Sequence, residues 1–135
     1  MFKKVHVFRV KPGQELASEI NRYCNENGIS SAVFIGIIGS VTSARLGFLK
    51  ELPGKYETQE YKGPLEIVGA QGSVAYMDSQ IIVHVHLQVS NQRECYGGHL
   101  VEAEVFSTAE VMIGELTYQV YRYADDYTGL NELQF

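Results

Sequence analysis

The sequence IIVHVHLQV, residues 81–89, alternates aliphatic side chains with mostly polar ones. Because successive side chains of a β-strand point to opposite faces of the sheet, this pattern predicts a strand with one aliphatic face. His84 and His86 then lie together on the other face. The rise per residue of a strand places their Cα atoms about 6.5–7 Å apart. Two imidazoles at that separation can lean together and share one ion.

A third histidine, His99, follows the pair Gly97-Gly98. A glycine pair permits a bend or a close backbone approach, which would aim His99 from a neighbouring strand towards the other two. Three imidazole nitrogens suit zinc with a fourth coordination position left open. The sequence therefore predicts a metal site formed by His84, His86 and His99, with zinc as the cofactor, although the same ligands also accept nickel, copper or cobalt.

Only one segment of the sequence has a clear helical period. Apolar side chains recur at helical spacing from Leu16 to Cys24, and Gly28 follows as a C-terminal glycine, so residues 14–27 are predicted to form an amphipathic helix. The remaining segments are typical of strands, at residues 1–10, 32–38, 44–49, 65–76, 81–89, 99–106, 111–113 and 116–123. Turns are expected at 77–80 and 90–93, with a turn-rich stretch at 53–64. One main helix packed on a largely antiparallel or mixed sheet of seven to eight strands is an α+β fold.

Length and composition are those of a single domain spanning residues 1–135, long enough to bury a core. Hydrophobic residues make up 45% of the chain, which excludes a disordered class. The two cysteines, Cys24 and Cys95, are too few for a disulfide framework and are predicted to be free thiols, with Cys95 a minor alternative metal ligand. The absence of a signal sequence and of any apolar run long enough for a bilayer predicts a cytoplasmic protein with no membrane partner.

The formal net charge of −5 argues against unaided binding to nucleic acid, because such binding depends on Lys and Arg side chains that neutralise phosphates. The sheet also offers more apolar surface than one helix can cover. Exposed apolar patches of that size usually mark interfaces. A homo-oligomer is therefore expected.

Several motifs together resemble a known family. The sequence IIVHVHLQVS (81–90) followed by YGGHL (96–100) resembles the signature of the plants and prokaryotes conserved (PPC) domain, which occurs alone in bacteria and archaea and fused to AT-hooks in plants. The segments GIIGSVTSARLGF (36–48) and GPLEIVGAQGSV (63–74) are similar to the glycine-rich and G-x-[FL]-E-I-L blocks of that family. VEAEVFSTAEVMI (101–113) and DDYTGL (125–130) also fit, so the resemblance covers effectively the whole chain.

The resemblance implies an α+β fold, assembly as a homotrimer, and a metal, usually zinc, held by the histidines of HxH and GGH. Those histidines are His84, His86 and His99 in this sequence. DNA contact in the plant members is made by the Arg-Gly-Arg-Pro core of the AT-hook, and no such core occurs here. The turn before GGH, residues 91–94, lacks the glycine of many relatives, which is expected to alter the turn and leave the ligands unchanged.

Three carboxylates near these motifs are candidate partners of the site. Glu102 and Glu104 follow His99 on one predicted strand, and by parity both should lie on the opposite face, in a solvated or inter-subunit role. Glu66 is bracketed by aliphatic residues, a setting in which a carboxylate usually has a partner or a raised pKa. For Glu66, a functional and a purely structural role remain equally open.

The sequence leaves three functions open. The first is a metal-binding trimeric domain with a regulatory or small-ligand-binding role. The second is a metal-dependent enzyme of the hydrolase or lyase type, in which a water in the open position of the zinc has a lowered pKa; no general acid or base lies within the histidine motif, so catalytic residues stay unassigned. The third, DNA binding, is disfavoured. Ser40 and Arg45 are a further candidate, as an anion-receiving loop, although the Gly36-x-x-Gly39 spacing is too weak to establish phosphate binding.

Overall fold

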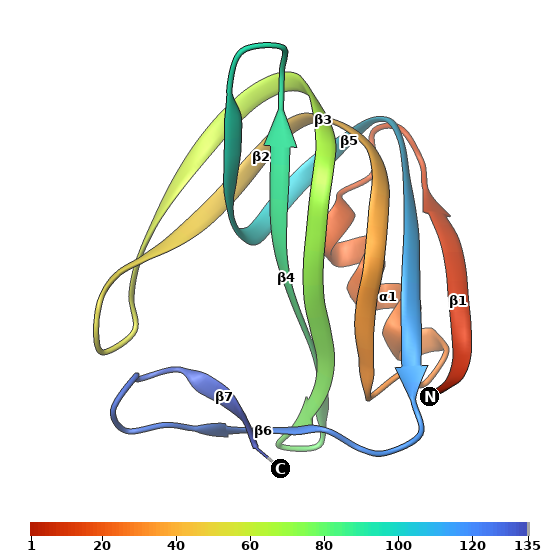
Figure 1. The fold of residues 1–135 in the computed structure, drawn as a ribbon, viewed down its shortest axis with the longest axis vertical. Helices are drawn as coiled ribbons and strands as arrows, with labels where there is room; N and C mark the ends of the chain where they lie inside the picture. The colour runs from red at the N-terminus through yellow and green to blue at the C-terminus, as the bar shows by residue number, and fades with distance from the viewer. Residues whose placement is uncertain (135) are drawn as a thin grey trace.

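The computed structural model describes residues 1–134, which form one helix and seven strands (Figure 1). The elements are β1 (Phe2–Val10), α1 (Leu16–Glu26), β2 (Ala32–Glu51), β3 (Lys55–Met77), β4 (Gln80–Ser90), β5 (Cys95–Leu116), β6 (Tyr121–Ala124) and β7 (Asn131–Gln134). This content agrees with the predicted α+β class and with a sheet of seven strands. Within residues 1–134, no helix combines the length and hydropathy needed to cross a bilayer.

The strands are longer than the sequence pattern indicates. The predicted strands at 32–38 and 44–49 are one strand, β2, and those at 99–106 and 111–113 are both parts of β5. Gly39 does not end a strand: a Cβ at this position would lie 1.8 Å from the backbone oxygen of Thr108, so the glycine permits close approach of β5. Register shifts between β2 and β5, which include one between Gly39 and Val41, let both strands bend and continue.

Two further segments differ from the prediction, whereas the two predicted hairpin turns agree with it. Most of the stretch predicted to be rich in turns, residues 53–64, belongs to β3, which pairs with β2 from Lys55 onward. The predicted strand at 116–123 is instead the end of β5, a short connection and the start of β6. The hairpin turn at 77–80 is confirmed, with positive φ angles of 48° and 62° at Asp78 and Ser79. The turn predicted at 90–93 is confirmed except for its first residue, since Ser90 ends β4 and residues 91–94 connect it to β5.

Four long strands pair in a closed ring. β2 pairs with β3, β3 with β4, β4 with β5, and β5 again with β2, all antiparallel. β1 extends the sheet along β5, and β6 joins β3 in parallel through Tyr76 and Tyr121 before β7 completes a hairpin. The sheet is therefore mixed, as predicted, and the β6–β7 hairpin reaches the strand next to β4.

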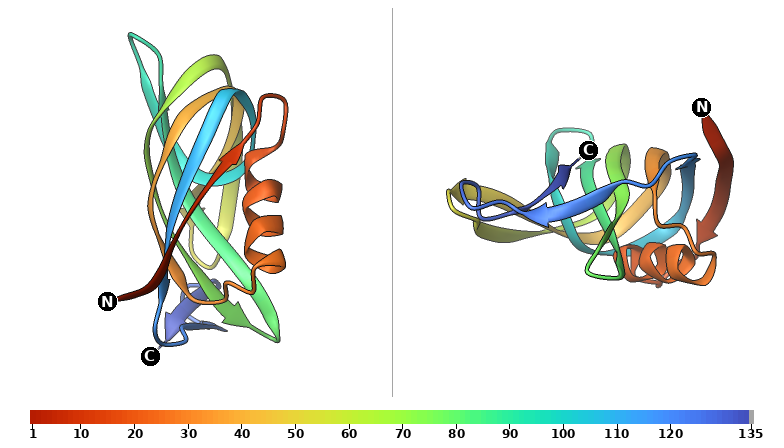
Figure 2. Two further views of the ribbon diagram at one scale, coloured as in Figure 1. Left: turned by 90° about the vertical axis from the view of Figure 1, so that its right-hand side faces the viewer. Right: turned by 90° about the horizontal axis from the view of Figure 1, so that it is seen from below.

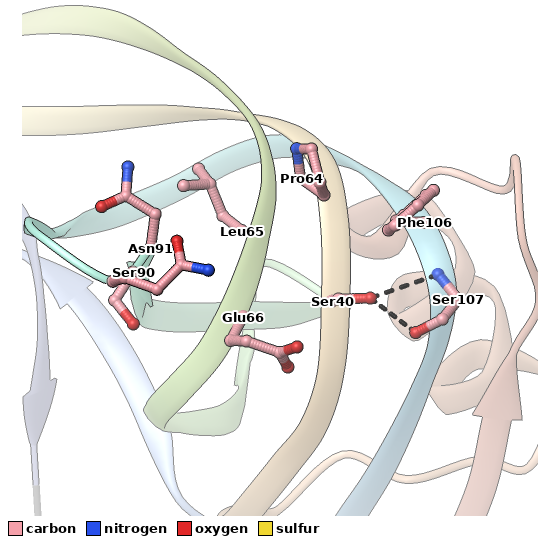
Figure 3. A pocket seen from close by; sticks show the side chains of 9 residues that line it. Ser40, Pro64, Leu65, Glu66, Ser90, Asn91, Phe106 and Ser107 are labelled. Atoms are coloured by element: carbon pink, nitrogen blue, oxygen red, sulfur yellow. Dashed lines mark hydrogen bonds between the residues drawn. The ribbon is translucent and has the colours of Figure 1, made fainter.

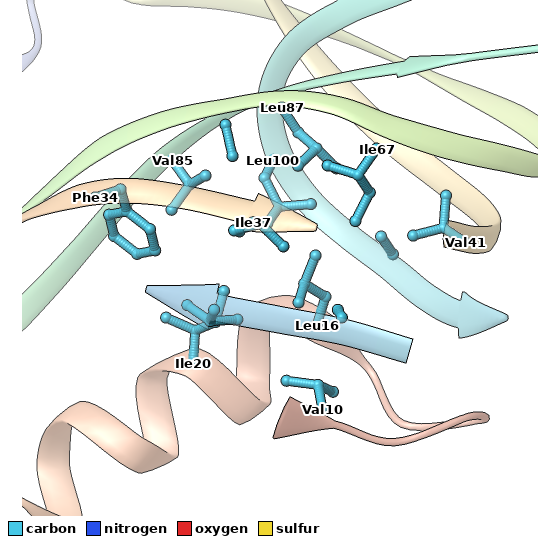
Figure 4. Packing of buried hydrophobic residues seen from close by; sticks show 14 of the residues in the cluster. Val10, Leu16, Ile20, Phe34, Ile37, Val41, Ile67, Val85, Leu87 and Leu100 are labelled. Atoms are coloured by element: carbon cyan, nitrogen blue, oxygen red, sulfur yellow. The ribbon is translucent and has the colours of Figure 1, made fainter. Parts of the chain in front are cut away.

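The core lies between α1 and the sheet. Helix α1 runs along one face of the strands (Figure 2) and buries Leu16, Ile20 and Cys24 completely. The aliphatic face of β4 packs in the same cluster, with Val85 and Leu87 close to residues of β2, β3 and β5 (Figure 4). Because alternate side chains of β4 are held in this core, its histidines must project from the other face. Both cysteines are free thiols, as predicted, with Cys24 buried and Cys95 exposed.

A single carboxylate fastens α1 to the sheet. Glu15 accepts hydrogen bonds from the backbone N–H groups of Ala17 and Ser18, each at 2.8 Å, and so caps the helix N-terminus. Its Oε2 atom also accepts a hydrogen bond of 2.9 Å from the backbone N–H of Ala103 in β5. Glu15 therefore satisfies donors of two elements at once.

Replacing Glu15 with alanine is expected to lower the free energy of unfolding by about 2–4 kcal/mol, because the change removes a helix cap and leaves the amide of buried Ala103 without a partner. Urea denaturation followed by circular dichroism measures this loss. The matched control is Glu26→Ala at the exposed end of the same helix, which should change stability by less than about 0.5 kcal/mol. Equal effects of the two substitutions would contradict the role given to Glu15.

Candidate metal centre

Two adjacent strands bring the three predicted histidines together. His84 and His86 lie two residues apart on β4, and His99 on β5 is the direct cross-strand partner of His86. The ring centroids are 5.0 Å apart for His84 and His86, 4.7 Å for His84 and His99, and 5.9 Å for His86 and His99. One nitrogen from each ring lies within 4.8 Å of the other two. The cluster predicted from strand alternation and the glycine pair therefore exists.

The environment of the rings fits a metal. His84 and His99 are half-buried and His86 is exposed. Within residues 1–134, His84 Nε2 and His99 Nδ1 are buried and have no hydrogen-bond partner. Buried polar atoms nearly always have a partner, so two unpartnered nitrogens in one cluster need an explanation. A divalent ion with nitrogen ligands, as zinc prefers, would satisfy both atoms.

The surroundings of His84 and His99 favour the neutral form of both imidazoles. Burial, with smaller contributions from the neighbouring His99, Arg122 and His86, lowers the pKa of His84 to about 4. Burial also lowers the pKa of His99, with a smaller contribution from His86. A metal binds the deprotonated nitrogen of imidazole, so these shifts leave His84 and His99 in their binding form at neutral pH.

The shift at His84 predicts how the stability of the metal-free protein depends on pH. The folded-state pKa of about 4 lies below the ordinary value of 6.5, so between these values the unfolded chain binds more protons than the folded one. Stability should therefore fall as the pH drops from about 6.5 towards 4, by up to about 1.4 kcal/mol per pH unit, and should level off above 6.5. Urea titrations of chelator-treated protein between these limits test this prediction. His84→Gln should show a shallower slope, and an identical slope would assign the effect to other groups.

Arg122 on β6 is a site residue that the sequence interpretation missed. Its side chain is buried, with a relative exposure of 7%, and Nη2 lies 3.3 Å from His84 Nδ1. Nη1 donates to the backbone oxygen of Asn131 at 2.7 Å, and Nη2 donates to Ser73 Oγ at 2.9 Å. The sequence Val120-Tyr121-Arg122-Tyr123 could have indicated this burial. On a strand, Arg122 lies on the same face as the aliphatic residue Val120.

A cavity of ≈ 300 Å³ opens beside the histidines. Strands β3, β4 and β5 supply Tyr56, Ile82, Val83, His84 and His99, and the β6–β7 hairpin with its loop supplies Arg122, Leu130, Asn131 and Glu132. The hairpin therefore forms a wall of the cavity, and an ion on the histidines would be next to a space that can hold a small molecule.

The structure corrects the parity argument for Glu102 and Glu104. A register shift in β5 lies between Leu100 and Glu102, so Leu100 and Ala103 both face the core. The bulge puts Glu102 and Glu104 on the same side of the strand as His99, because an extra residue reverses the alternation. Glu102 nevertheless has a solvated role, in a surface ion pair with Arg45 at 3.4 Å.

The remaining candidates lie away from the histidines. Glu66 is exposed, because its neighbours on β3 take the core positions, so the expected setting among aliphatic side chains is wrong. Ser40 is buried and forms a 2.5 Å hydrogen bond with Ser107 at a cavity of ≈ 590 Å³ that Glu66 also lines (Figure 3). Arg45 pairs with Glu102 instead, so Ser40 and Arg45 do not form an anion-receiving loop.

Cys95 is not part of the cluster. It pairs with Ser90 at the opposite end of the β4–β5 ladder from His86 and His99, and its side chain is exposed. The grouping of potential ligands found in residues 1–134 consists of the three histidines alone. Cys95 is therefore not brought to the position of a ligand.

The model of the family described as the Plants and Prokaryotes Conserved (PCC) domain, also abbreviated PPC, matches residues 1–117. The chain belongs to this family. The resemblance inferred from the histidine and glycine motifs is thereby confirmed. The matched region contains His84, His86 and His99, whereas Arg122 and the β6–β7 hairpin follow it.

Solved structures of similar proteins share the fold of this PPC domain. The metal-containing protein AF0104 from Archaeoglobus fulgidus is 31% identical, with a TM-score of 0.90, over 100% of this chain and 96% of that chain. A PPC protein from Pyrococcus horikoshii is also 31% identical, with a TM-score of 0.90, over 100% of this chain and 94% of that one.

A curated relative is much longer than this chain. The bifunctional protein GlmU of Synechococcus sp. (strain JA-3-3Ab) is 31% identical over 133 residues, which is 96% of this chain and 20% of that protein. This chain therefore spans about a fifth of the length of the curated relative, and the similarity is to one segment of it.

Proposed function

We propose that this protein is a metal-binding PPC domain that holds one zinc ion per chain on His84, His86 and His99 and binds a small ligand there. The observation that carries the proposal is the cluster of three imidazoles, two of which have buried nitrogens without partners in the described part of the chain. The description of AF0104 as a metal-containing protein supports it.

A zinc ion with three nitrogen ligands would supply a Lewis acid with a position left for a ligand atom. The chain's own residues fix the rings: the β4 backbone orients His84 and His86, and β5 holds His99 opposite His86. The adjoining cavity of ≈ 300 Å³ suits a small molecule, which favours a ligand-binding role over a purely structural one.

Elemental analysis of untagged protein tests the proposal. We expect about one zinc per chain, removal of the metal by a strong chelator, and recovery of the same ratio when zinc is added back. Protein that holds no metal, even after zinc is supplied in excess, would refute the proposed function. Reconstitution with nickel, copper and cobalt in parallel shows which ion the site prefers.

We also propose that the protein forms a homotrimer. Ile35, Ile38 and Val68 on the outer face of β2 and β3 have relative exposures of 49%, 62% and 56% and line one hollow of ≈ 630 Å³. Apolar side chains grouped in this way usually lie in an interface between chains. Two further copies of this chain are the proposed occupants, since a symmetric assembly covers the same patch on every copy.

Sedimentation equilibrium of the wild type is expected to give three times the chain mass. Ile38→Glu places a charge in the proposed interface and should shift the protein to monomers at micromolar concentration. The control Thr42→Glu introduces the same charge at an exposed position further along β2 and should leave the mass unchanged. A monomeric wild type would refute the trimer and leave the metal site untouched.

The cavity beside the histidines also favours a second candidate, a zinc-dependent hydrolase or lyase. Glu132 lines the same cavity and is the carboxylate available there for proton transfer. Hydrolysis of p-nitrophenyl acetate by the zinc-loaded protein, abolished by the chelator and reduced in Glu132→Gln, would favour the enzyme. A rate equal to that of the chelated protein would favour ligand binding alone.

A further inference from the structure

We infer that the ligand of this centre is a small monocarboxylate. The carboxylate group of this ligand would bind Arg122 and also occupy the open position of the metal. The inference rests on the proposed function, since it requires a metal on the three histidines. It goes further by naming the chemical class of the ligand and a binding residue outside the region matched by the family model.

Arg122 is a buried charge whose hydrogen-bonding capacity is only partly used. A guanidinium carries five N–H donors. Its two hydrogen bonds to acceptor oxygens go to neutral groups, the backbone oxygen of Asn131 and the hydroxyl of Ser73. The Nε atom is buried without a partner, and within residues 1–134 no carboxylate forms an ion pair with this arginine.

A buried charge normally has a counter-charge, because removal of an ion from water is unfavourable unless an opposite charge replaces the lost hydration. Arg122 has a relative exposure of only 7%, and burial lowers the pKa of its guanidinium, while the nearby carboxylate of Glu132 offsets part of this shift. The cavity that Arg122 lines also contains His84 and His99. The carboxylate of Glu132 acts on Arg122 without forming an ion pair, so an anion in that cavity would supply a counter-charge in direct contact with the guanidinium, next to the metal position.

The contact between Arg122 and His84 links the metal to the anion. Arg122 Nη2 lies 3.3 Å from His84 Nδ1, and both residues line the same cavity. An anion that accepts hydrogen bonds from the guanidinium would therefore lie next to the imidazole proposed to bind the metal. A carboxylate there could reach the open position of the metal with its second oxygen, so metal and anion should favour each other's binding.

The cavity limits the size and charge of the anion. A volume of ≈ 300 Å³ corresponds to about ten water molecules, enough for an acid of a few carbon atoms. Ile82, Val83 and Leu130 provide apolar wall for an aliphatic tail. Glu132 lines the same cavity, accepts a 3.0 Å hydrogen bond from Thr128, and would repel a dianion more than a monoanion. These features favour a monocarboxylate over phosphate.

The test uses butyrate as the probe, with butyramide as its uncharged match and inorganic phosphate as the other anion. In isothermal titration calorimetry of the zinc-loaded protein, we expect butyrate to bind at least about tenfold more tightly than butyramide or phosphate. A hydrogen bond to a charged group changes an affinity by about tenfold or more. Removal of the metal should weaken butyrate binding by a similar factor.

Arg122→Gln, with its zinc content verified, should weaken butyrate binding by about tenfold or more and leave butyramide binding unchanged. The control Arg93→Gln removes an arginine from the exposed turn before the glycine pair and should bind butyrate as the wild type does. If Arg122→Gln does not fold, the wild-type comparisons of butyrate with butyramide, with and without zinc, decide the question.

Failure of the carboxylate inference can be distinguished from failure of the proposed metal-binding function. Protein that holds zinc but binds butyrate no better than butyramide, or binds it equally well in Arg122→Gln, overturns the carboxylate inference and leaves the metal function standing. Tighter binding of phosphate than of butyrate overturns the assignment of the ligand class. Protein that takes up no zinc overturns the proposed function and the inference together.

Discussion

His84→Ala is expected to weaken zinc binding by about a hundredfold. Structural zinc bound by four ligands in small domains is worth about 10–16 kcal/mol, or about 3 kcal/mol for each ligand, and every 1.4 kcal/mol is a factor of ten. The ring of His84 is the one nearest to both other rings, with centroid distances of 4.7 Å to His99 and 5.0 Å to His86. Its loss leaves two imidazoles on separate strands, which cannot fill a tetrahedral site alone.

Competition with a chromophoric zinc chelator measures this change directly. His6→Gln is the matched control, because His6 is the fourth histidine of the chain and is held by Glu115 at 3.0 Å, away from the cluster. This control should keep the wild-type zinc affinity. His86→Ala and His99→Ala should each lose affinity as His84→Ala does. An unchanged affinity in His84→Ala would remove this residue from the ligand set.

Gly72→Ala is expected to damage both the fold and the metal site. Gly72 on β3 is the cross-strand partner of Val85, and a Cβ at this position would lie 2.2 Å from the backbone oxygen of His84. That oxygen belongs to the backbone and cannot rotate away, so β3 and β4 must separate at the strand that carries two of the histidines. Overpacking of this kind lowers the free energy of unfolding by about 3 kcal/mol.

For a chain of this size, a loss of about 3 kcal/mol in Gly72→Ala corresponds to a fall of about 10 °C in the melting temperature. Calorimetry at one fixed protein concentration measures it, because assembly makes melting dependent on concentration. Gly36→Ala is the matched control on β2, since a Cβ there meets no atom within 4 Å, and it should change stability by less than about 0.5 kcal/mol. Zinc affinity should fall in Gly72→Ala and stay unchanged in Gly36→Ala. Similar melting temperatures for the two variants would contradict the close approach of the strands.

The two predictions are connected through β4. Val85, Leu87 and Val89 on this strand are at most 4% exposed, and they alternate with the histidines. A change that shifts the strand therefore acts on the core and on the candidate ligands together. This arrangement gives the imidazoles fixed positions, since their backbone is held by pairing with β3 on one side and β5 on the other.

Local patterns were sufficient for the helix, the histidine strand and the turn at 77–80. Each depends on interactions between residues near in sequence, such as the helical period of Leu16 and Ile20 or the alternation around His84. The extents of β2 and β5 were not predictable in this way. Gly39 follows the strand predicted at 32–38, which the sequence pattern ends there, yet the backbone of Thr108, about seventy residues later, is what requires a glycine at this position.

The sequence by itself determined the faces of β4 and the identity of the three histidines, because side-chain alternation along a strand needs no knowledge of distant residues. The tertiary structure decided the rest. It brought His99 opposite His86, reversed the parity of Glu102 through a bulge, and placed Arg122 beside His84. These outcomes depend on strand register and on the path of the β6–β7 hairpin, which are set by pairing between segments far apart in the chain.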